Sequence, residues 1–202
     1  MSATSDNDDI QNQNRIMPPP ASAYFIARND DETVQHTLSV LVDNASGVLA
    51  RIIGLFSARG YNIDSLTVSE TEHERHLSRI TIVSSGTPKT LEQIKRQLER
   101  MVPVHRVVDL TLVARDKGHD KPLERELALV KVAGLGEKRV EAMRLADAFR
   151  AQVIDASTAH FTFEITGRTS KVEQFIAIMA PLGLVEVCRT GIAAMNRGED
   201  GM

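Results

Sequence analysis

The sequence lacks several residue types on which common functions depend. Its 202 residues include one cysteine, no tryptophan and only 4% aromatic residues. A single cysteine excludes a disulfide framework or a multi-cysteine metal site, and so few aromatics argue against a base-stacking surface. With 24 basic and 27 acidic residues, the chain has no basic field to hold a polyanion. This charge balance predicts no nucleic-acid partner. No run of about 18 apolar residues occurs, so we also expect no membrane-spanning helix.

The first 35 residues are polar and acidic. They contain six acidic residues, two basic residues and the run Pro18-Pro19-Pro20. A secretory signal needs a basic start followed by an apolar run, and this segment has neither. Such a composition buries too little surface to offset its ordering entropy. The sequence therefore predicts a disordered acidic tail over 1–35 and a cytoplasmic chain.

From His36 onward, the hydrophobic pattern alternates between strand and helix periods. Apolar residues at positions 38, 40 and 42 alternate as in a strand, and those at 48, 49, 52, 53 and 56 follow helical spacing. A second helix is predicted from Thr87-Pro88 to Met101. Further strands are predicted at 63–71, around 80–82 and at 104–113. The resulting order, β-α-β-β-α-β, is the ferredoxin-like unit.

The same order recurs after a polar linker over 115–122. The expected elements are a strand at 126–133, a helix at 137–151, a hairpin at 152–156 and 160–165, a helix at 170–181 and a strand at 184–192. The sequence thus predicts an α+β protein with two ferredoxin-like domains, over 36–114 and 123–198. Both domains are small and leave strand edges unpaired, which favours an oligomer.

No residue pattern points to catalysis. His73 and His76 lie in a polar turn without the further ligands that a metal site needs. Cys188 is predicted to be a small buried residue of the last strand rather than a nucleophile. The 134–136 segment is half of a dinucleotide fingerprint, but Arg139 occupies the third glycine position. We expect no catalytic residue, metal site or cofactor in this chain.

The strongest local signal is the turn Asp43-Asn44-Ala45-Ser46-Gly47, which precedes Val48-Leu49. At the start of a helix, backbone N–H groups and the helix dipole favour an anion. Gly47 lets a ligand approach the backbone closely, and Asn44 offers both a donor and an acceptor. The alternative is that Asn44 and Ser46 simply cap the helix.

Several segments closely resemble the small, regulatory subunits of acetohydroxyacid synthase, also called acetolactate synthase. The most specific are Asp43–Leu49, Gly54–Ile63, Ser65–Val68 and Leu77–Arg79, followed by Glu124–Lys131 and Arg189–Gly191. The resemblance covers about 36–198 and identifies 36–114 as an ACT domain, the amino-acid-sensing member of the ferredoxin-like folds. The acidic extension departs from the shorter bacterial form.

The resemblance implies a chain that regulates an enzyme without being one. In this family a separate large subunit, carrying thiamine diphosphate, Mg²⁺ and FAD, condenses two pyruvates or pyruvate with 2-ketobutyrate. This is the first common step toward valine, leucine and isoleucine. The small subunit raises that activity and confers feedback inhibition, usually by valine.

The family also implies where the effector binds. ACT domains pair side by side, and the 44–47 turn of one chain faces Asn62 and Ile63 of the other. Backbone N–H groups near Gly47 would take the carboxylate, and Asn44 and Asn62 would accept from the ammonium. Apolar side chains would cover the isopropyl group, whose burial is worth about 1.5–3 kcal/mol. The expected effector-binding residues are Asn44, Ala45, Ser46, Gly47, Val48, Leu49, Asn62 and Ile63.

Two other functions compete with this interpretation. One is an ACT-type amino-acid sensor that regulates a different enzyme, and the other is an enzyme in its own right. The second domain and its 124–131 stretch favour the synthase subunit over the first alternative. The missing chemistry disfavours the second. The main effector, the stoichiometry with the large subunit and the surface that contacts it are left open by the sequence.

Overall fold

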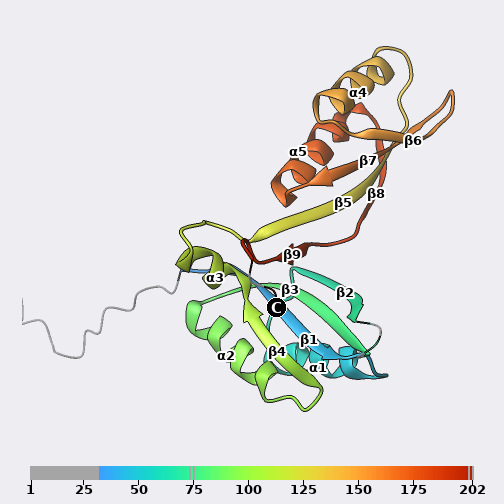
Figure 1. Ribbon diagram of the computed structural model, residues 1–202. Coiled ribbons are helices and arrows are strands. Elements are labelled where there is room, and N and C mark those ends of the chain that lie inside the picture. The colour runs from blue at the N-terminus through green and yellow to red at the C-terminus, as the bar shows by residue number, and fades with distance from the viewer. Residues whose placement is uncertain (1–31, 73, 75, 200, 202) are drawn as a thin grey trace, which may run out of the picture. The chain divides into compact units, whose positions relative to one another are not determined.

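The structure, a computed structural model, describes residues 32–202 apart from residues 73, 75, 200 and 202. Most of the predicted acidic tail lies outside the described residues, and the first strand begins at Val34 rather than at His36. The described chain forms two antiparallel sheets, each built in the predicted βαββαβ order (Figure 1). The α+β fold with two ferredoxin-like domains is confirmed.

The boundaries of the elements follow local sequence signals. Helix α2, for example, begins after Thr87, whose Oγ1 accepts the N–H of Thr90 at 3.2 Å, with Pro88 in its first turn. The first domain contains β1 (Val34–Asp43), α1 (Val48–Arg59), β2 (Ser65–Glu72), β3 (Leu77–Gly86), α2 (Pro88–Glu99), β4 (Val104–Asp109) and α3 (Leu110–Asp116). The second contains β5 (Leu123–Val132), α4 (Glu137–Ala148), β6 (Gln152–Ala156), β7 (Phe161–Gly167), α5 (Thr169–Met179), η2 (Ala180–Leu182), β8 (Leu184–Arg189) and β9 (Ala193–Met195).

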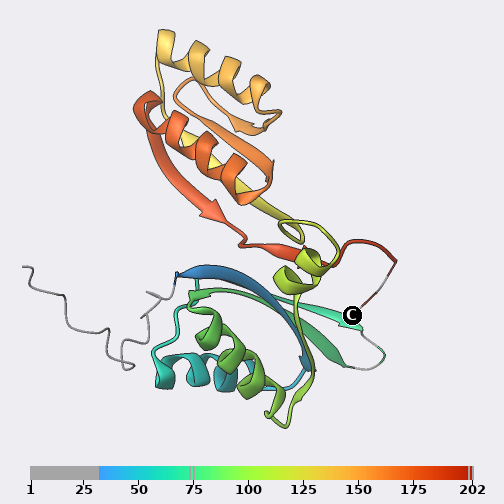
Figure 2. The same ribbon diagram turned by 90° about the vertical axis from the view of Figure 1, so that its left-hand side faces the viewer.

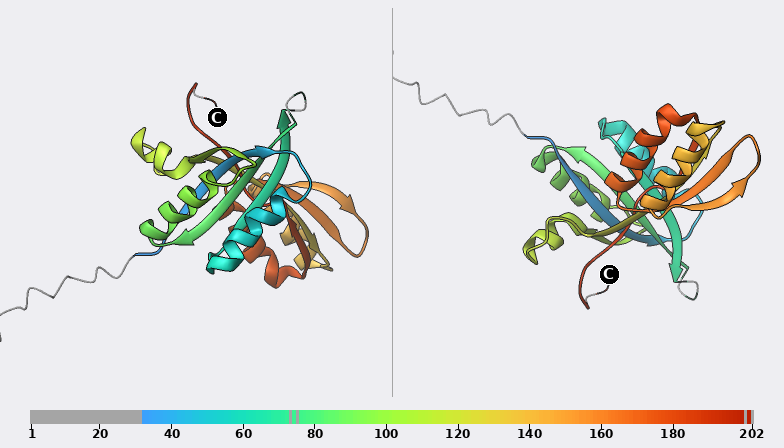
Figure 3. Two further views of the ribbon diagram at one scale, coloured as in Figure 1. Left: turned by 90° about the horizontal axis from the view of Figure 1, so that it is seen from below. Right: turned by 90° about the horizontal axis from the view of Figure 1, so that it is seen from above.

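The first sheet has the strand order β2-β3-β1-β4, with β2 and β4 at its edges. Leu38 pairs with Ile82 and Val40 with Ile80, so alternate residues of the two central strands point to the same face. Helices α1 and α2 lie side by side across that face (Figure 3). The apolar face that alternation produces on the strands therefore packs against the apolar faces that the 3.6-residue period produces on the two helices.

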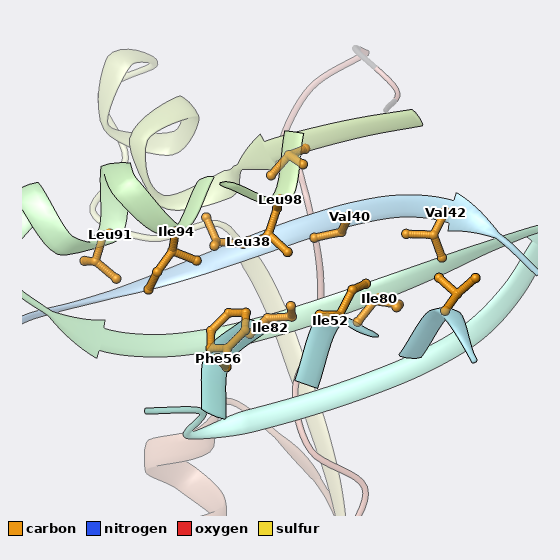
Figure 4. Packing of buried hydrophobic residues seen from close by; sticks show 12 residues of the cluster. Leu38, Val40, Val42, Ile52, Phe56, Ile80, Ile82, Leu91, Ile94 and Leu98 are labelled. Carbon is orange, nitrogen blue, oxygen red and sulfur yellow. The ribbon is translucent and has the colours of Figure 1, made fainter. Parts of the chain in front are cut away.

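The core of the first domain lies between this face and the two helices (Figure 4). Ile52 and Phe56 project from α1, and Leu91, Ile94 and Leu98 project from α2; each is at most 1% exposed. Burying one such side chain contributes about 1.5–3 kcal/mol. These contacts account for the helical spacing of apolar residues in both segments.

A helix follows β4 where the sequence predicts a continued strand. The predicted strand over 104–113 is wrong after Asp109, because the apolar run there satisfies either period. The Asp109 carboxylate accepts the N–H groups of Thr111 and Leu112, both at 3.0 Å, and so caps α3. The first residue of this helix, Leu110, is buried. Local capping and burial together end the strand.

A buried polar contact holds α3 against β1. The Nδ1 atom of His36 lies 2.7 Å from Oδ2 of Asp109, and both side chains are 5% exposed. The N–H of Thr37 donates to Oγ1 of Thr111 at 3.0 Å. Leu110 packs with Val83 on the face of the sheet opposite α1 and α2. His36 therefore helps to hold α3 against the sheet, in addition to being part of strand β1.

The second sheet has the order β6-β7-β5-β8, and β9 also pairs with β5. Helices α4 and α5 lie on the same face of it (Figure 2). The core beneath them includes Ala128 and Val130 of β5 and the edge-to-face pair of Phe163 and Phe175, whose ring centroids are 6.0 Å apart. The second domain therefore repeats the architecture of the first.

Four predictions for the second domain need correction. The predicted last strand over 184–192 ends at Arg189, because Gly191 takes a positive φ of 81° and the chain then forms the separate strand β9. Cys188 is exposed, not buried, because β8 is an edge strand and this residue pairs with Leu129 on the face that α4 and α5 leave uncovered. Strand β5 begins at Leu123, three residues before its predicted start, because its first residues pair with β9. Helix α4 ends at Ala148, since Arg150 takes a positive φ of 55°.

Candidate functional site

The predicted effector turn joins β1 to α1 and is held from both sides. The N–H of Asp43 donates to the carbonyl of Pro103 at 2.9 Å, and the N–H of Asn44 donates to the carbonyl of His76 at 2.7 Å. Residues 44–47 are all exposed. A fixed backbone with exposed side chains suits a binding loop, because the binding groups need little ordering.

The start of α1 has no side-chain cap. Gly47 is the N-cap residue, with φ +83° and ψ −5°, and the helix start receives no side-chain cap hydrogen bond. The alternative in which Asn44 and Ser46 cap this helix is therefore wrong. The first N–H groups of a helix have no partner within it. The N–H of Val48 donates to the carbonyl of Ala45 at 3.3 Å. No described atom lies within 4 Å of where a Cβ on Gly47 would stand, so the space beside this residue is open.

The second half of the predicted site lies between α1 and β2. Asn62 is exposed, and its carbonyl accepts from Ser84 Oγ at 2.7 Å. Its side-chain amide nitrogen donates to Oδ1 of Asp64, so the amide oxygen is the group of this side chain available to accept a further hydrogen bond. Ile63 is half-buried against the core of the first domain, so only part of its side chain can cover an effector.

Asp64 is a candidate site residue that the sequence pattern did not single out. Its carboxylate also accepts from Gln35 Nε2 at 3.0 Å and from Ser85 Oγ. An exposed carboxylate beside Asn62 can attract an ammonium group. The feature of the sequence that could have identified Asp64 is its position, two residues after Asn62 in the same loop before β2.

One copy of the chain does not bring the two halves together. Asn44 to Leu49 lie at the start of α1, whereas Asn62 and Ile63 follow its end. A helix of 12 residues spans about 18 Å. Within one copy, the two groups of predicted effector residues therefore lie at opposite ends of α1.

Exposed apolar side chains lie beside the effector turn on α1 and β2. Leu49 and Ile53, one helical turn apart on α1, are 37% and 40% exposed, and Val68 on edge strand β2 is 47% exposed. An edge strand with apolar neighbours is a surface on which a second chain can pair. These three residues are therefore candidates for an interface with another chain.

The remaining sequence candidates have structural explanations or lie outside the described residues. His73 is outside them, and His76 is exposed with φ +52°. Among the described residues, no group of three or more His, Cys, Asp or Glu side chains could hold a metal ion. A Cβ on Gly134 would lie 3.2 Å from the carbonyl oxygen of Leu182, so close packing explains that glycine. No helix in the described part of the chain could cross a membrane.

Comparison with known proteins identifies two matching families and several similar chains. The "AHAS small subunit-like ACT domain" family matches residues 38–106, and the "small subunit of acetolactate synthase" family matches residues 125–198. A probable acetolactate synthase small subunit of Archaeoglobus fulgidus is 44% identical over 165 residues, which cover 82% of this chain and 98% of the relative. The isozyme 3 small subunit of Escherichia coli is 42% identical over 167 residues, with coverages of 82% and 98%.

A solved structure is similar as well. The crystal structure of an acetolactate synthase small subunit from Thermotoga maritima has a TM-score of 0.73 to this chain at 40% sequence identity. The match covers 83% of this chain and 99% of the other. Both domains are therefore shared with that structure.

Proposed function

Because the chain belongs to the family of acetolactate synthase small subunits, we propose that it activates a catalytic large subunit and makes it sensitive to valine or a related amino acid. The family implies a regulatory role in branched-chain amino-acid biosynthesis. Thiamine diphosphate, Mg²⁺ and FAD then belong to the large subunit, which performs the condensation. The observation that carries the effector site is the uncapped start of α1 at Gly47.

The effector's carboxylate binds at this helix start. The N–H groups of the first turn of α1 point along the helix axis toward its N-terminal end, which carries the positive end of the helix dipole. Such an end stabilises an anion by about 0.3–1 kcal/mol at an exposed position. Gly47 contributes by leaving the approach open. The same turn presents the amide of Asn44, which is exposed and does not cap the helix.

The effector's ammonium binds at the α1–β2 loop of the second copy. Asn62 offers its amide oxygen because its amide nitrogen is bonded to Asp64. The Asp64 carboxylate supplies the opposite charge that an ammonium needs. Ile63 and Leu49 provide apolar surface for a branched side chain, and neither offers a polar group to one that ends in a hydroxyl or carboxylate. The site therefore favours valine, leucine or isoleucine.

Two copies form this site by pairing along β2 and α1. Leu49, Ile53 and Val68 become buried in that pairing, which explains their exposure in the single chain. An amino acid that binds across the interface stabilises the arrangement that holds it. Coupling between sites is typically worth about 1–3 kcal/mol, enough to change the activity of a bound partner.

The alternative is an ACT-type sensor that regulates a different enzyme. The match of residues 125–198 to the synthase small subunits favours the synthase, because an ACT domain alone would not require that second domain.

Reconstitution tests the proposal. The purified chain is added to the large subunit from the same source, and acetolactate formation from pyruvate is measured with and without valine, leucine or isoleucine. We expect no activity from the chain alone, severalfold activation of the large subunit, and inhibition that needs the chain. Serine serves as the control amino acid, because its hydroxyl finds no partner among the apolar side chains. Failure to activate any large subunit, together with binding of a branched-chain amino acid, would instead support the alternative.

A further inference from the structure

The segment that follows β8 packs onto the first domain. Ile192 and Ala194 are 8% and 9% exposed and share an apolar cluster with Val83 and Leu110. The next residues form β9, which pairs with the first residues of β5 (Figure 1). One short segment therefore belongs both to the packing of the first domain and to the strand pairing of the second.

Two hydroxyl groups of β2 hold the peptide groups of Ile192. The N–H of Ile192 donates to Ser65 Oγ at 2.9 Å, and the carbonyl of Ile192 accepts from Thr67 Oγ1 at 3.0 Å. Both hydroxyls come from the same face of β2, because the two residues are two positions apart. Since Ile192 is buried, loss of either hydroxyl leaves a backbone polar group without its partner.

Gly191 is required for this close approach. It has φ +81°, a conformation that favours glycine. A Cβ on it would lie 2.9 Å from Ser65 Oγ and 3.0 Å from Thr67 Cγ2. Any side chain at this position would push the segment away from β2.

The other end of the segment is fixed to β5. The N–H of Thr190 donates to the carbonyl of Leu127 at 3.0 Å, and the N–H of Leu127 donates to Thr190 Oγ1 at 3.2 Å. The preceding residue, Arg189, forms a two-point ion pair with the buried Glu126. Ile192 therefore lies two residues from a direct hydrogen-bonded contact with β5.

The β2 end of this connection adjoins the proposed effector site. Ser65 follows Asn62 and Ile63 by three and two positions and is the first residue of β2. We infer that Ser65, Thr67 and Gly191 are positioning residues that transmit effector binding at the α1–β2 loop to the C-terminal domain. We call this contact the latch. The inference rests on the function proposed above and adds the route by which the two domains respond together.

The latch gives a structural role to two segments that resemble the family in sequence but lie outside the proposed effector site. Arg189–Gly191 supplies the ion pair, the bond to β5 and the glycine that permits contact. The 124–131 stretch supplies the receiving strand, including Glu126 and Leu127. A rigid contact of this kind transmits a shift because packed elements move together rather than deforming continuously.

Hydrogen exchange of the full chain tests the latch. Exchange of backbone amides is followed with and without saturating valine, with leucine and isoleucine as further probes. In the unmodified chain, we expect slower exchange at 44–49 and 62–65, where the effector binds. Exchange at 123–132 and 189–195 should slow by about 5- to 150-fold, the range for coupled sites.

The test variant is Ser65→Ala/Thr67→Val, which removes both hydroxyls while nearly keeping side-chain volume. The effector response at 44–49 and 62–65 should persist, whereas the response at 123–132 should fall below about 2-fold. The matched control is Ser69→Ala/Thr71→Val on the same strand, which should retain both responses. Gly191→Ala is a second, independent variant that should behave like the first. Thermal melting checks that each variant is folded.

The possible outcomes distinguish failure of the latch from failure of the proposed effector site. An effector response at 44–49 in the unmodified chain, without any response at 123–132, would overturn the latch and leave the effector site standing. So would a full response at 123–132 in the Ser65→Ala/Thr67→Val and Gly191→Ala variants. Absence of any response at 44–49 and 62–65 to all three amino acids would overturn the effector site and the latch with it.

Discussion

Arg189 donates from Nε and Nη2 to the two carboxylate oxygens of Glu126, at 2.6 and 2.7 Å. The two partners are unequally buried: the side chain of Glu126 is 3% exposed and that of Arg189 is 36% exposed. Donating these hydrogen bonds to the buried carboxylate of Glu126 raises the pKa of Arg189. The pair ends β8 at the point where the chain turns toward the first domain.

The unequal burial predicts unequal costs of breaking this pair. Arg189→Ala leaves a buried carboxylate without its partner and should lower the free energy of unfolding by about 3–5 kcal/mol. Glu126→Ala leaves a guanidinium that water can reach, and should cost only about 1 kcal/mol. Urea unfolding measures both. Lys131→Ala, which breaks an exposed pair with Glu186, is the control and should cost less than about 1 kcal/mol. Equal costs for the first two variants would contradict the argument.

The effector site predicts selective loss of feedback. Asn44→Ala or Asn62→Ala removes a hydrogen bond to a charged group, worth about 1.5–3 kcal/mol, so inhibition should need about 10- to 100-fold more valine. Activation of the large subunit should persist. Gly47→Asp should be more severe, because it adds a negative charge where the carboxylate approaches.

Thermal melting of the same variants provides the control. Because Asn44 does not cap α1, Asn44→Ala should leave the melting temperature nearly unchanged. Unaltered valine sensitivity in both Asn62→Ala and Gly47→Asp would rule out this site.

Pairing of two copies can be tested on α1. Ile53→Asp places a charge in the proposed interface and should shift the chain toward monomer in analytical ultracentrifugation, with valine inhibition lost as well. Leu112→Asp is the matched control, since Leu112 is 43% exposed on α3, away from α1. It should leave the assembly unchanged. A dimer that persists in Ile53→Asp would show that copies pair elsewhere.

Asp109 predicts a stability effect in the first domain. Asp109→Ala removes the cap of α3 and the partner of His36, and should cost about 2–4 kcal/mol. The exposed Asp116→Ala, at the other end of α3, should cost less than about 0.5 kcal/mol. Urea unfolding followed by circular dichroism measures both; a small cost at Asp109 would mean that Leu110 alone holds this helix.

The sequence by itself determined the two domains and most of their elements. Period-two alternation at 38–42 and helical spacing at 48–56 each point to one local structure, and both patterns arise because one face must be buried. The positions of the 44–47 turn before a helix and of Asn62 in a loop could also be predicted, because strand ends, helix starts and loops are local features of the sequence.

Only the tertiary structure decided the rest, since those features depend on residues distant in sequence. Whether 110–113 continued a strand or began a helix depended on a cap at Asp109 and on packing against Val83. The exposure of Cys188 depended on which strand lies at the sheet edge. The role of Gly191 depended on its approach to β2, more than 120 positions earlier in the chain. Periodicity reports which face of a segment is buried; which other segment buries it is settled only when the chain is folded.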